Sequence, residues 1–170
     1  MQAVQGLMYF LGTQGRTRAY QNPAKIGQLS VSSSEGKAKQ NFHAVVGRER
    51  AGCAIYYKTV SWFSLDLGKG RSLSPTAYTL RHGREDGTDA LRTWELQGSH
   101  DGKVWSVIKS HDNDTALTGA WSTATWLVDY HSDTPKGFQM FRLLKRGLNS
   151  SGKDHLHVGG IELYGDLFFD

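Results

Sequence analysis

The apolar residues of the chain fall in short runs bounded by Gly, Asn, Asp and Ser, and no long run repeats with the period of an amphipathic helix. Where the pattern is clearest, apolar and polar positions alternate. The alternation puts Phe63, Leu65 and Leu67 on one face of a strand, and Tyr78 and Leu80 on one face of another. This pattern predicts half-buried β-strands.

The same pattern predicts strands over residues 7–11, 26–31, 62–68, 76–82, 92–98, 104–109, 122–128, 138–145 and 158–164. Asp101-Gly102 indicates a hairpin turn, because both residues tolerate positive φ. Asn22-Pro23 indicates a capped turn. Residues 35–58 form an irregular loop anchored by Phe42, Val45 and Val46. These elements predict an all-β fold, an antiparallel β-sandwich or jelly roll, without a convincing helix.

A length of 170 residues suits a single domain over 1–170. Trp62, Trp94, Trp105 and Trp126 lie in alternating strands, so we expect them in the core. Arg81 and Arg92 are expected to be structural and to pair with carboxylates across strands. Residues 166–170 form either an edge strand or the start of a segment that belongs to a longer protein.

The net charge of +4 is spread along the chain, with Lys and Arg interleaved with Asp and Glu. A nucleic-acid-binding protein usually concentrates its cations, so we expect no nucleic-acid partner. The single cysteine, Cys53, cannot form an internal disulfide, and neither a signal peptide nor a membrane-spanning stretch is visible. These features predict an intracellular, soluble domain with no membrane partner.

The chain has no nucleophile elbow or other local catalytic signature, so we expect no enzymatic activity and no cofactor. His155 and His157 are two residues apart and would share one face of a strand, where a cation could bind. Two ordinary surface histidines explain the pair better, and no metal site is predicted.

Three segments in order resemble discoidin domains, the C-type domains of coagulation factors V and VIII, which share the galactose-binding-like sandwich. Residues 61–68 (SWFSLDLG) and 96–105 (LQGSHDGKVW) are similar to a strand and a hairpin of those domains. Residues 141–143 (FRL) and 160–165 (GIELYG) are similar to their closing strand pair. Discoidin-like domains often hold a structural calcium ion, but no dense Asp/Asn loop in the N-terminal half supports one here.

A narrower resemblance covers nearly the whole chain. Residues 78–82 (YTLRH), 90–94 (ALRTW) and 122–126 (STATW) are similar to a module in a large HECT-type E3 ubiquitin ligase and in plant BTB proteins. Residues 149–157 (NSSGKDHLH) resemble a loop of the DOC domain of the anaphase-promoting complex that reads substrate degrons. SUN domains share this sandwich as well. The likeness implies an intracellular protein-recognition module linked to ubiquitin ligation.

Discoidin-like modules bind through loops at one end of the sandwich, which implies a site on the loops 82–91, 112–121 and 149–157. The candidate ligand-binding residues on these loops are Arg84, Asp86, Asp112, Asp114, Trp121, Asn149, Ser151, Lys153, Asp154 and His155. The ligase module has a small residue where this chain has Trp121, so this Trp is either an exposed anchor or folded onto the core.

Three functions remain open at this point. The first is recognition of a peptide or protein partner, with a degron as one possibility, for substrate recruitment in a ubiquitin ligase. The second is a carbohydrate-binding module, since the fold class often binds sugars. The third is a structural or oligomerisation domain, which a contiguous apolar patch on a sheet face would favour.

Overall fold

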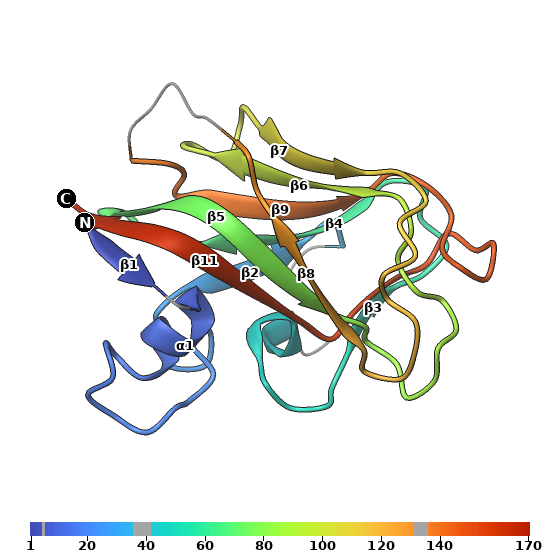
Figure 1. The fold of residues 1–170 in the computed structure, drawn as a ribbon, viewed down its shortest axis with the longest axis horizontal. Helices are drawn as coiled ribbons and strands as arrows, with labels where there is room; N and C mark the ends of the chain where they lie inside the picture. Colours follow the sequence, from blue (N-terminus) through green and yellow to red (C-terminus); the bar gives the residue numbers. More distant parts are fainter. Residues whose placement is uncertain (5, 36–41, 131–135) are drawn as a thin grey trace.

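Two antiparallel sheets face each other in the computed structural model, which describes residues 1–4, 6–35, 42–130 and 136–170 (Figure 1). The five-stranded sheet has the order β2-β4-β9-β6-β7 and comprises Ser30–Ser33 (β2), Ser61–Asp66 (β4), Met140–Lys145 (β9), Trp94–Ser99 (β6) and Ser106–His111 (β7). The four-stranded sheet has the order β1-β11-β5-β8 and comprises Gln2–Val4 (β1), Gly160–Phe169 (β11), Arg71–Arg81 (β5) and Thr123–Leu127 (β8). The predicted all-β antiparallel sandwich is confirmed.

Four short elements complete the fold. Cys53–Ile55 (β3) and Leu156–Val158 (β10) form a two-stranded sheet. The helix Leu7–Gly12 (α1) and the 3-10 helix Phe42–Val46 (η1) both contact β11. No helix in the described part of the chain is long and apolar enough to cross a bilayer.

The core lies between the two sheets and is built by the alternation seen in the sequence. The strand residues that it buries with at most 3% exposure include Phe63, Leu65, Leu73, Tyr78, Leu80, Trp94, Leu96, Phe141, Leu143, Leu163 and Leu167. The loop anchors Phe42, Val45 and Val46 are buried as expected. Burial of these apolar side chains is the main force that holds the sheets together.

The predicted strand over residues 7–11 is wrong, because the chain forms α1 there. Leu7, Met8 and Leu11 are buried along one side of this helix. Its first amides meet a distant carboxylate, since the backbone N–H groups of Met8 and Tyr9 donate to Glu162 at 2.6 and 3.2 Å. The contact with Glu162 cannot be predicted from a six-residue apolar run. It satisfies backbone N–H groups of the first helical turn that have no partner within the helix.

The N-terminal half differs from the expectation in two further places. The strand predicted over residues 26–31 begins only at Ser30, because residues 22–28 make turns, with the Ala24 amide donating to Asn22 Oδ1 at 2.9 Å as the predicted cap requires. The loop predicted over residues 35–58 contains η1 and β3, and its residues 36–41 lie outside the described part.

The hairpin between β6 and β7 is confirmed, with Gly102 at φ +75°. Ser99 Oγ accepts the Gly102 amide at 2.9 Å, and Asp101 Oδ1 accepts the Lys103 amide at 2.8 Å. Asp101 itself keeps a negative φ, so only the glycine needs the left-handed conformation in this turn.

The tryptophan prediction is correct for one residue and partly correct for another. Trp94 is fully buried, and Trp126 is partly buried against the core. Trp62 and Trp105 are only half-buried, and both stack on the Arg142 guanidinium, with ring centroids 5.8 and 4.2 Å away. An aromatic ring can therefore occupy an alternating position and still serve as a platform for a cation.

The predicted pairing of Arg81 and Arg92 with carboxylates is also wrong. Arg81 Nη1 donates to the carbonyl oxygens of Arg48 and Glu49, and Arg92 Nη1 donates to that of Leu117 at 2.9 Å. Both arginines tie loops to the sandwich through main-chain acceptors, which a sequence does not mark.

Residues 166–169 belong to β11. Asp166 and Leu167 pair with β1 and β5, whereas Phe168 and Phe169 pair with β5 alone, so the strand is at the sheet edge only over these last two residues. Because β1 lies against the last part of β11, the two chain ends lie close together (Figure 1). They lie at the end of the sandwich opposite to the loops that follow β5, β7 and β9.

Candidate functional site

The three loops expected to carry the site meet at one end of the sandwich. Main-chain hydrogen bonds join them: the Trp121 amide donates to Arg84 O at 3.1 Å, and the Ser150 amide donates to Ala90 O at 2.8 Å. The loops therefore form one surface on the end of the two sheets, at the right of Figure 1.

The backbone of this end is strained. Tyr57, Asp89, Asn113 and Trp121 have φ between 47° and 58°, in the left-handed region that non-glycine residues seldom adopt. Such conformations cost energy and persist only where the surrounding structure enforces them, and they gather at ligand sites. The strain marks this end as a candidate site.

A hollow of about 490 Å³ opens at this end, and we call it the loop-end hollow. Its walls are Gly52, Ala54, Tyr56, Gly83, Arg84, Glu85, Trp121 and His157. The loop after β5 supplies Arg84 and Glu85, the loop before β8 supplies Trp121, and β10 supplies His157. The hollow thus combines two aromatic rings with charged and polar groups.

His157 is the buried polar group of the loop-end hollow, with 5% of its surface exposed. Its Nε2 atom makes no hydrogen bond within the described residues and lies 3.9 Å from Asp89 Oδ2. Burial lowers the pKa of His157 to about 4, although the Asp89 carboxylate acts in the opposite direction. The ring is therefore neutral at pH 7, and its Nε2 atom is buried behind the surface of the hollow.

Asp89 holds the neighbouring groups in place. Its carboxylate accepts hydrogen bonds from Arg84 Nη1 and, at 3.1 Å, from Asn149 Nδ2. Burial would raise the pKa of Asp89, but the nearby His157 and Arg84 lower it below its usual value. A second carboxylate, Asp86, lies 3.6 Å from Arg84 Nε, so Arg84 is fixed at the rim of the loop-end hollow.

Asp86 itself is exposed and lies outside the walls of the hollow. Hydrogen bonds from the Thr88 hydroxyl at 2.6 Å and the Thr88 amide at 3.0 Å lower the pKa of Asp86.

Asn149 and Ser151 form the frame of the third loop. Asn149 Oδ1 accepts the amides of Ser151 and Lys153 at 3.0 and 3.1 Å, and Ser151 Oγ accepts the Asp89 amide at 2.9 Å. Their polar atoms are thus used to join two loops. Lys153 is exposed beside them.

Asp154 and His155 also have partners within the protein. Asp154 Oδ1 accepts a hydrogen bond from the buried Lys145 Nζ at 2.8 Å. His155 is 4% exposed, and its Nδ1 accepts the Tyr57 amide at 3.1 Å.

Asp114 belongs to a buried polar network below the second loop. Its Oδ2 accepts hydrogen bonds from His111 Nδ1 and Trp126 Nε1, both at 2.9 Å. His111 Nε2 in turn meets the Tyr78 hydroxyl. Burial lowers the pKa of His111 and raises that of Tyr78, so both groups stay neutral inside the core. Asp112, which follows His111 in the sequence, is exposed.

Of the ten residues predicted from the sequence, the structure places Arg84 and Trp121 in the walls of the loop-end hollow. Tyr56, Glu85 and His157 also line it and were not among them. In the sequence, the adjacent tyrosines Tyr56 and Tyr57 were the available signal for the wall of the hollow that the prediction missed. In the structure they are 47% and 82% exposed. Exposed aromatic pairs are common in recognition surfaces.

The two histidines considered for a metal pack around a tyrosine. The Tyr56 ring centroid lies 5.0 Å from that of His155 and 5.4 Å from that of His157. Within the described ranges, no group of three or more His, Cys, Asp or Glu residues is arranged to hold a metal ion. Burial raises the pKa of the Cys53 thiol to about 11, which disfavours the thiolate.

The buried histidines predict a pH dependence of stability. The pKa of His157 is lower in the folded chain than in an unfolded one, so unfolding takes up a proton below pH ~6.5. Stability should therefore decrease as the pH falls from ~6.5 towards ~4, by at most about 1.4 kcal/mol per pH unit for one such histidine. Burial lowers the pKa of His82 and His111 as well, and adds to the effect.

Urea unfolding at pH 7 and pH 5 measures this change. The His157→Gln variant should lose less stability between the two values than the wild type, while His43→Gln, at an exposed position, should lose the same amount. Equal losses in all three proteins would contradict the assignment to His157.

Comparison with known proteins identifies relatives along almost the whole chain, although no family model matches it. The chain is 37% identical over 166 residues to the E3 ubiquitin-protein ligase Ufd4 of Drosophila melanogaster and 37% identical over 169 residues to hecd-1 of Caenorhabditis elegans. Each alignment covers 95% of this chain but 6% of the ligase. A BTB/POZ domain-containing protein of Arabidopsis thaliana is 28% identical, over 94% of this chain and 20% of its own length.

Solved structures share the fold at low identity. An F5/8 type C domain from Bacteroides fragilis superposes with a TM-score of 0.61 and 15% identity, over 82% of this chain and 93% of that domain. A family 32 module from Clostridium perfringens, solved with GalNAc-β-1,3-galactose, has a TM-score of 0.60 and 13% identity, over 82% of this chain and 96% of that module. The chain therefore has the F5/8 type C sandwich fold.

Proposed function

We propose that this discoidin-like sandwich, which is homologous to a region of the E3 ubiquitin-protein ligases Ufd4 and hecd-1, is a non-catalytic module that binds a peptide or protein partner. In an intracellular ligase the partner would be a substrate to be recruited. The observation that carries the proposal is the loop-end hollow, whose walls bring Trp121 and Tyr56 together with Arg84 and His157.

The chemistry of the loop-end hollow suits a polypeptide. Aromatic side chains and arginine dominate the energetics of protein interfaces. Tyr57 and Val60, in the segment that follows Tyr56, are 82% and 66% exposed and offer further apolar surface.

The test is a peptide-display selection on the wild-type chain, followed by affinity measurements on the selected peptides with Trp121→Gly. Glycine suits the positive φ of this position, so the variant removes the ring without straining the backbone. We expect binding to weaken by at least about 2 kcal/mol, the usual loss for an interface anchor. The control is Phe169→Ala, an exposed aromatic in β11 near the opposite end.

The proposal fails if no peptide is enriched, or if Trp121→Gly and Phe169→Ala have the same affinity as the wild type for every selected peptide. Circular dichroism of both variants establishes that any loss arises from the missing ring and not from unfolding.

Carbohydrate binding is the second candidate, because the loop-end hollow places aromatic rings beside Arg84, Glu85 and His157. Such a mixture also suits a sugar, and a module of the same fold was solved with GalNAc-β-1,3-galactose. Titration with galactose and GalNAc-β-1,3-galactose distinguishes the two functions. Sugar binding that Trp121→Gly abolishes, together with no enriched peptide, would favour the carbohydrate function.

A further inference from the structure

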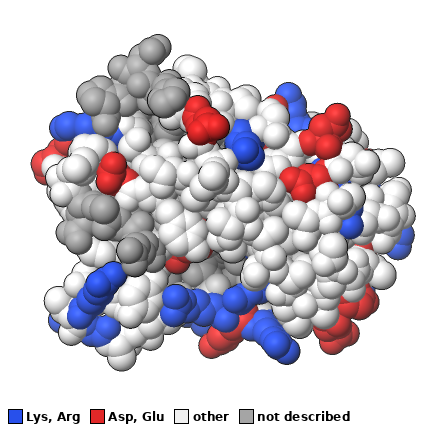
Figure 2. Space-filling model, in the orientation of Figure 1, with Lys and Arg blue, Asp and Glu red and all other residues white. Residues whose placement is uncertain are grey.

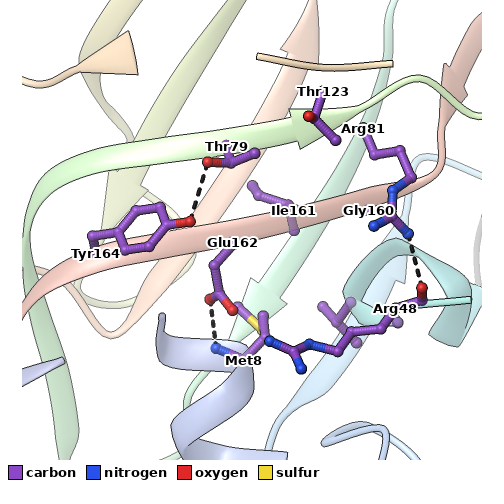
Figure 3. Close-up of a pocket in the computed structure, with 11 residues that line it drawn as sticks. Met8, Arg48, Thr79, Arg81, Thr123, Gly160, Ile161, Glu162 and Tyr164 are labelled. Atoms are coloured by element: carbon purple, nitrogen blue, oxygen red, sulfur yellow. Dashed lines mark hydrogen bonds between the residues drawn. The ribbon is translucent and has the colours of Figure 1, made fainter. Parts of the chain in front are cut away.

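A second recess lies on the outer face of the four-stranded sheet. Different residues line it, although Arg81 and Thr123 in the recess are two positions along the chain from Gly83 and Trp121 in the loop-end hollow. It has a volume of about 210 Å³ and lies between α1 and the segment that follows η1 (Figure 3). A neighbouring cavity of about 280 Å³ shares Gly47 and Arg48 with it. We call the two together the arginine groove.

Arg48 lies where the two cavities meet, and aromatic rings fix its side chain. Its guanidinium carbon is 4.7 Å from the ring centroid of Tyr9 and 4.8 Å from that of Tyr20, and these two rings are stacked at 6.3 Å. No hydrogen bond or ion pair in the described part of the chain uses the guanidinium of Arg48. The group is thus held in position with its N–H donors available.

Arg81 brings a second guanidinium to the same recess from the end of β5 (Figure 3). Its Nη1 donates to the carbonyl oxygens of Arg48 and Glu49 at 3.0 and 3.3 Å. These bonds fix the side chain at the wall, and its hydrogen bonds within the described residues use Nη1 only. Nε and Nη2 therefore remain available to a ligand.

Glu162 is the acidic group of the recess, but main-chain donors already satisfy it. Its carboxylate accepts the amides of Met8, Tyr9 and Leu163 at 2.6, 3.2 and 3.0 Å. Among the described residues it makes no ion pair with either arginine, although the nearby charge of Arg48 acts to lower its pKa. The second cavity adds one further cation, Lys25, and one carboxylate, Glu49.

We propose that the arginine groove binds an acidic peptide segment, with one anionic side chain between Arg48 and Arg81 and an adjoining residue in the second cavity beside Tyr20. Planar guanidinium groups match the paired oxygens of carboxylates and of phosphates, so the same site can recognise either anion. A volume of about 210 Å³ is below the range of roughly 300–1,000 Å³ typical of small-molecule sites, and it suits one side chain.

The surface around the groove supports an anionic partner. Figure 2 shows several Lys and Arg side chains along the lower rim of the molecule, with acidic side chains among them, over the part that η1 and the following segment occupy in Figure 1. Arg48 and Arg50 are exposed in that segment. Clustered cations raise the local concentration of an acidic ligand and speed its association.

Fluorescence anisotropy with the 170-residue chain tests the proposal, using short labelled peptides that carry glutamate, phosphoserine or glutamine at the same positions. We expect the glutamate or the phosphoserine peptide to bind and the glutamine peptide not to bind. The first two distinguish a carboxylate from a phosphoryl ligand, and inorganic phosphate as a competitor shows whether the isolated anion suffices.

The decisive variant is Arg48→Gln, which removes an exposed group without a hydrogen bond. It should raise the Kd of the bound peptide about tenfold or more, as expected for the loss of charge-assisted hydrogen bonds. Arg50→Gln, an exposed arginine that lines neither cavity, should change the Kd less than about twofold. Trp121→Gly should leave this binding unchanged, which separates the groove from the loop-end hollow.

Two results would overturn the proposal. The first is no binding of either anionic peptide at low salt. The second is equal weakening by Arg48→Gln and Arg50→Gln, which would indicate a diffuse attraction to the basic surface in place of a site.

Discussion

Replacement of Asp154 by alanine should destabilise the chain by about 3 kcal/mol, because it leaves a buried ammonium group without its counter-ion. The side chain of Lys145 has 0% of its surface exposed, and its Nζ donates to Asp154 Oδ1 at 2.8 Å and to Thr59 O at 3.1 Å. The Asp154 side chain is 34% exposed, so the loss should lie at the low end for a broken buried pair.

Urea unfolding of Asp154→Ala measures this loss. Asp112→Ala, an exposed carboxylate on the second loop, is the matched control and should change stability by less than about 0.5 kcal/mol. Lys145→Met combined with Asp154→Ala should recover most of the loss, since the double variant buries no unpaired charge. A loss below about 1 kcal/mol would show that Lys145 gains access to water without its partner.

The second large effect is expected for Trp94→Ala, at about 4 kcal/mol. Trp94 is fully buried, and its ring stacks on His111 with centroids 3.9 Å apart and planes 10° apart. Its Nε1 donates to the Tyr78 hydroxyl at 3.0 Å. Alanine would leave a cavity and remove one donor from the polar network that includes Asp114.

Thermal and urea unfolding of Trp94→Ala should be compared with Trp105→Ala. Trp105 is half-buried on the hairpin and stacks on Arg142, so its loss should cost about 1 kcal/mol. If the two variants unfold at the same urea concentration, the assignment of Trp94 to the core and Trp105 to the surface is incorrect.

These two predictions show where sequence reasoning reaches its limit. The alternation around Phe63 and Leu65 predicts a strand and its buried face, since both follow from the two-residue period of a strand. The same period cannot tell which face of the sheet meets the other sheet. Trp94 and Trp105 therefore look alike in the sequence although only Trp94 is buried.

Long-range contacts explain the errors in the N-terminal half. The helix α1 begins against Glu162, a residue more than 150 positions away, and Arg81 is bound by carbonyl groups of the segment after η1. No local pattern carries these pairings, because a main-chain acceptor is present at every residue.

The sequence predicted which loops come together at one end of the sandwich better than it predicted which side chains line the hollow there. The polar loops after β5, β7 and β9 do meet at one end, as the resemblance implied. The sequence does not show which polar side chains are used internally: Asn149 and Asp114 hold loops and core together, while Arg84 and Trp121 line the hollow. His157 lies in a strand, as the sequence pattern suggested, but the sequence does not show that it also lines the hollow.

The pairing of β1 with the last part of β11 has a consequence for how such a module can be mounted on a larger protein. Both ends of the chain lie at one end of the sandwich, and the loop-end hollow lies at the other. A longer polypeptide joined at both termini would therefore leave the hollow facing away from the point of attachment. Lengthening or stiffening those two junctions would then alter the reach of the hollow without touching any residue that lines it.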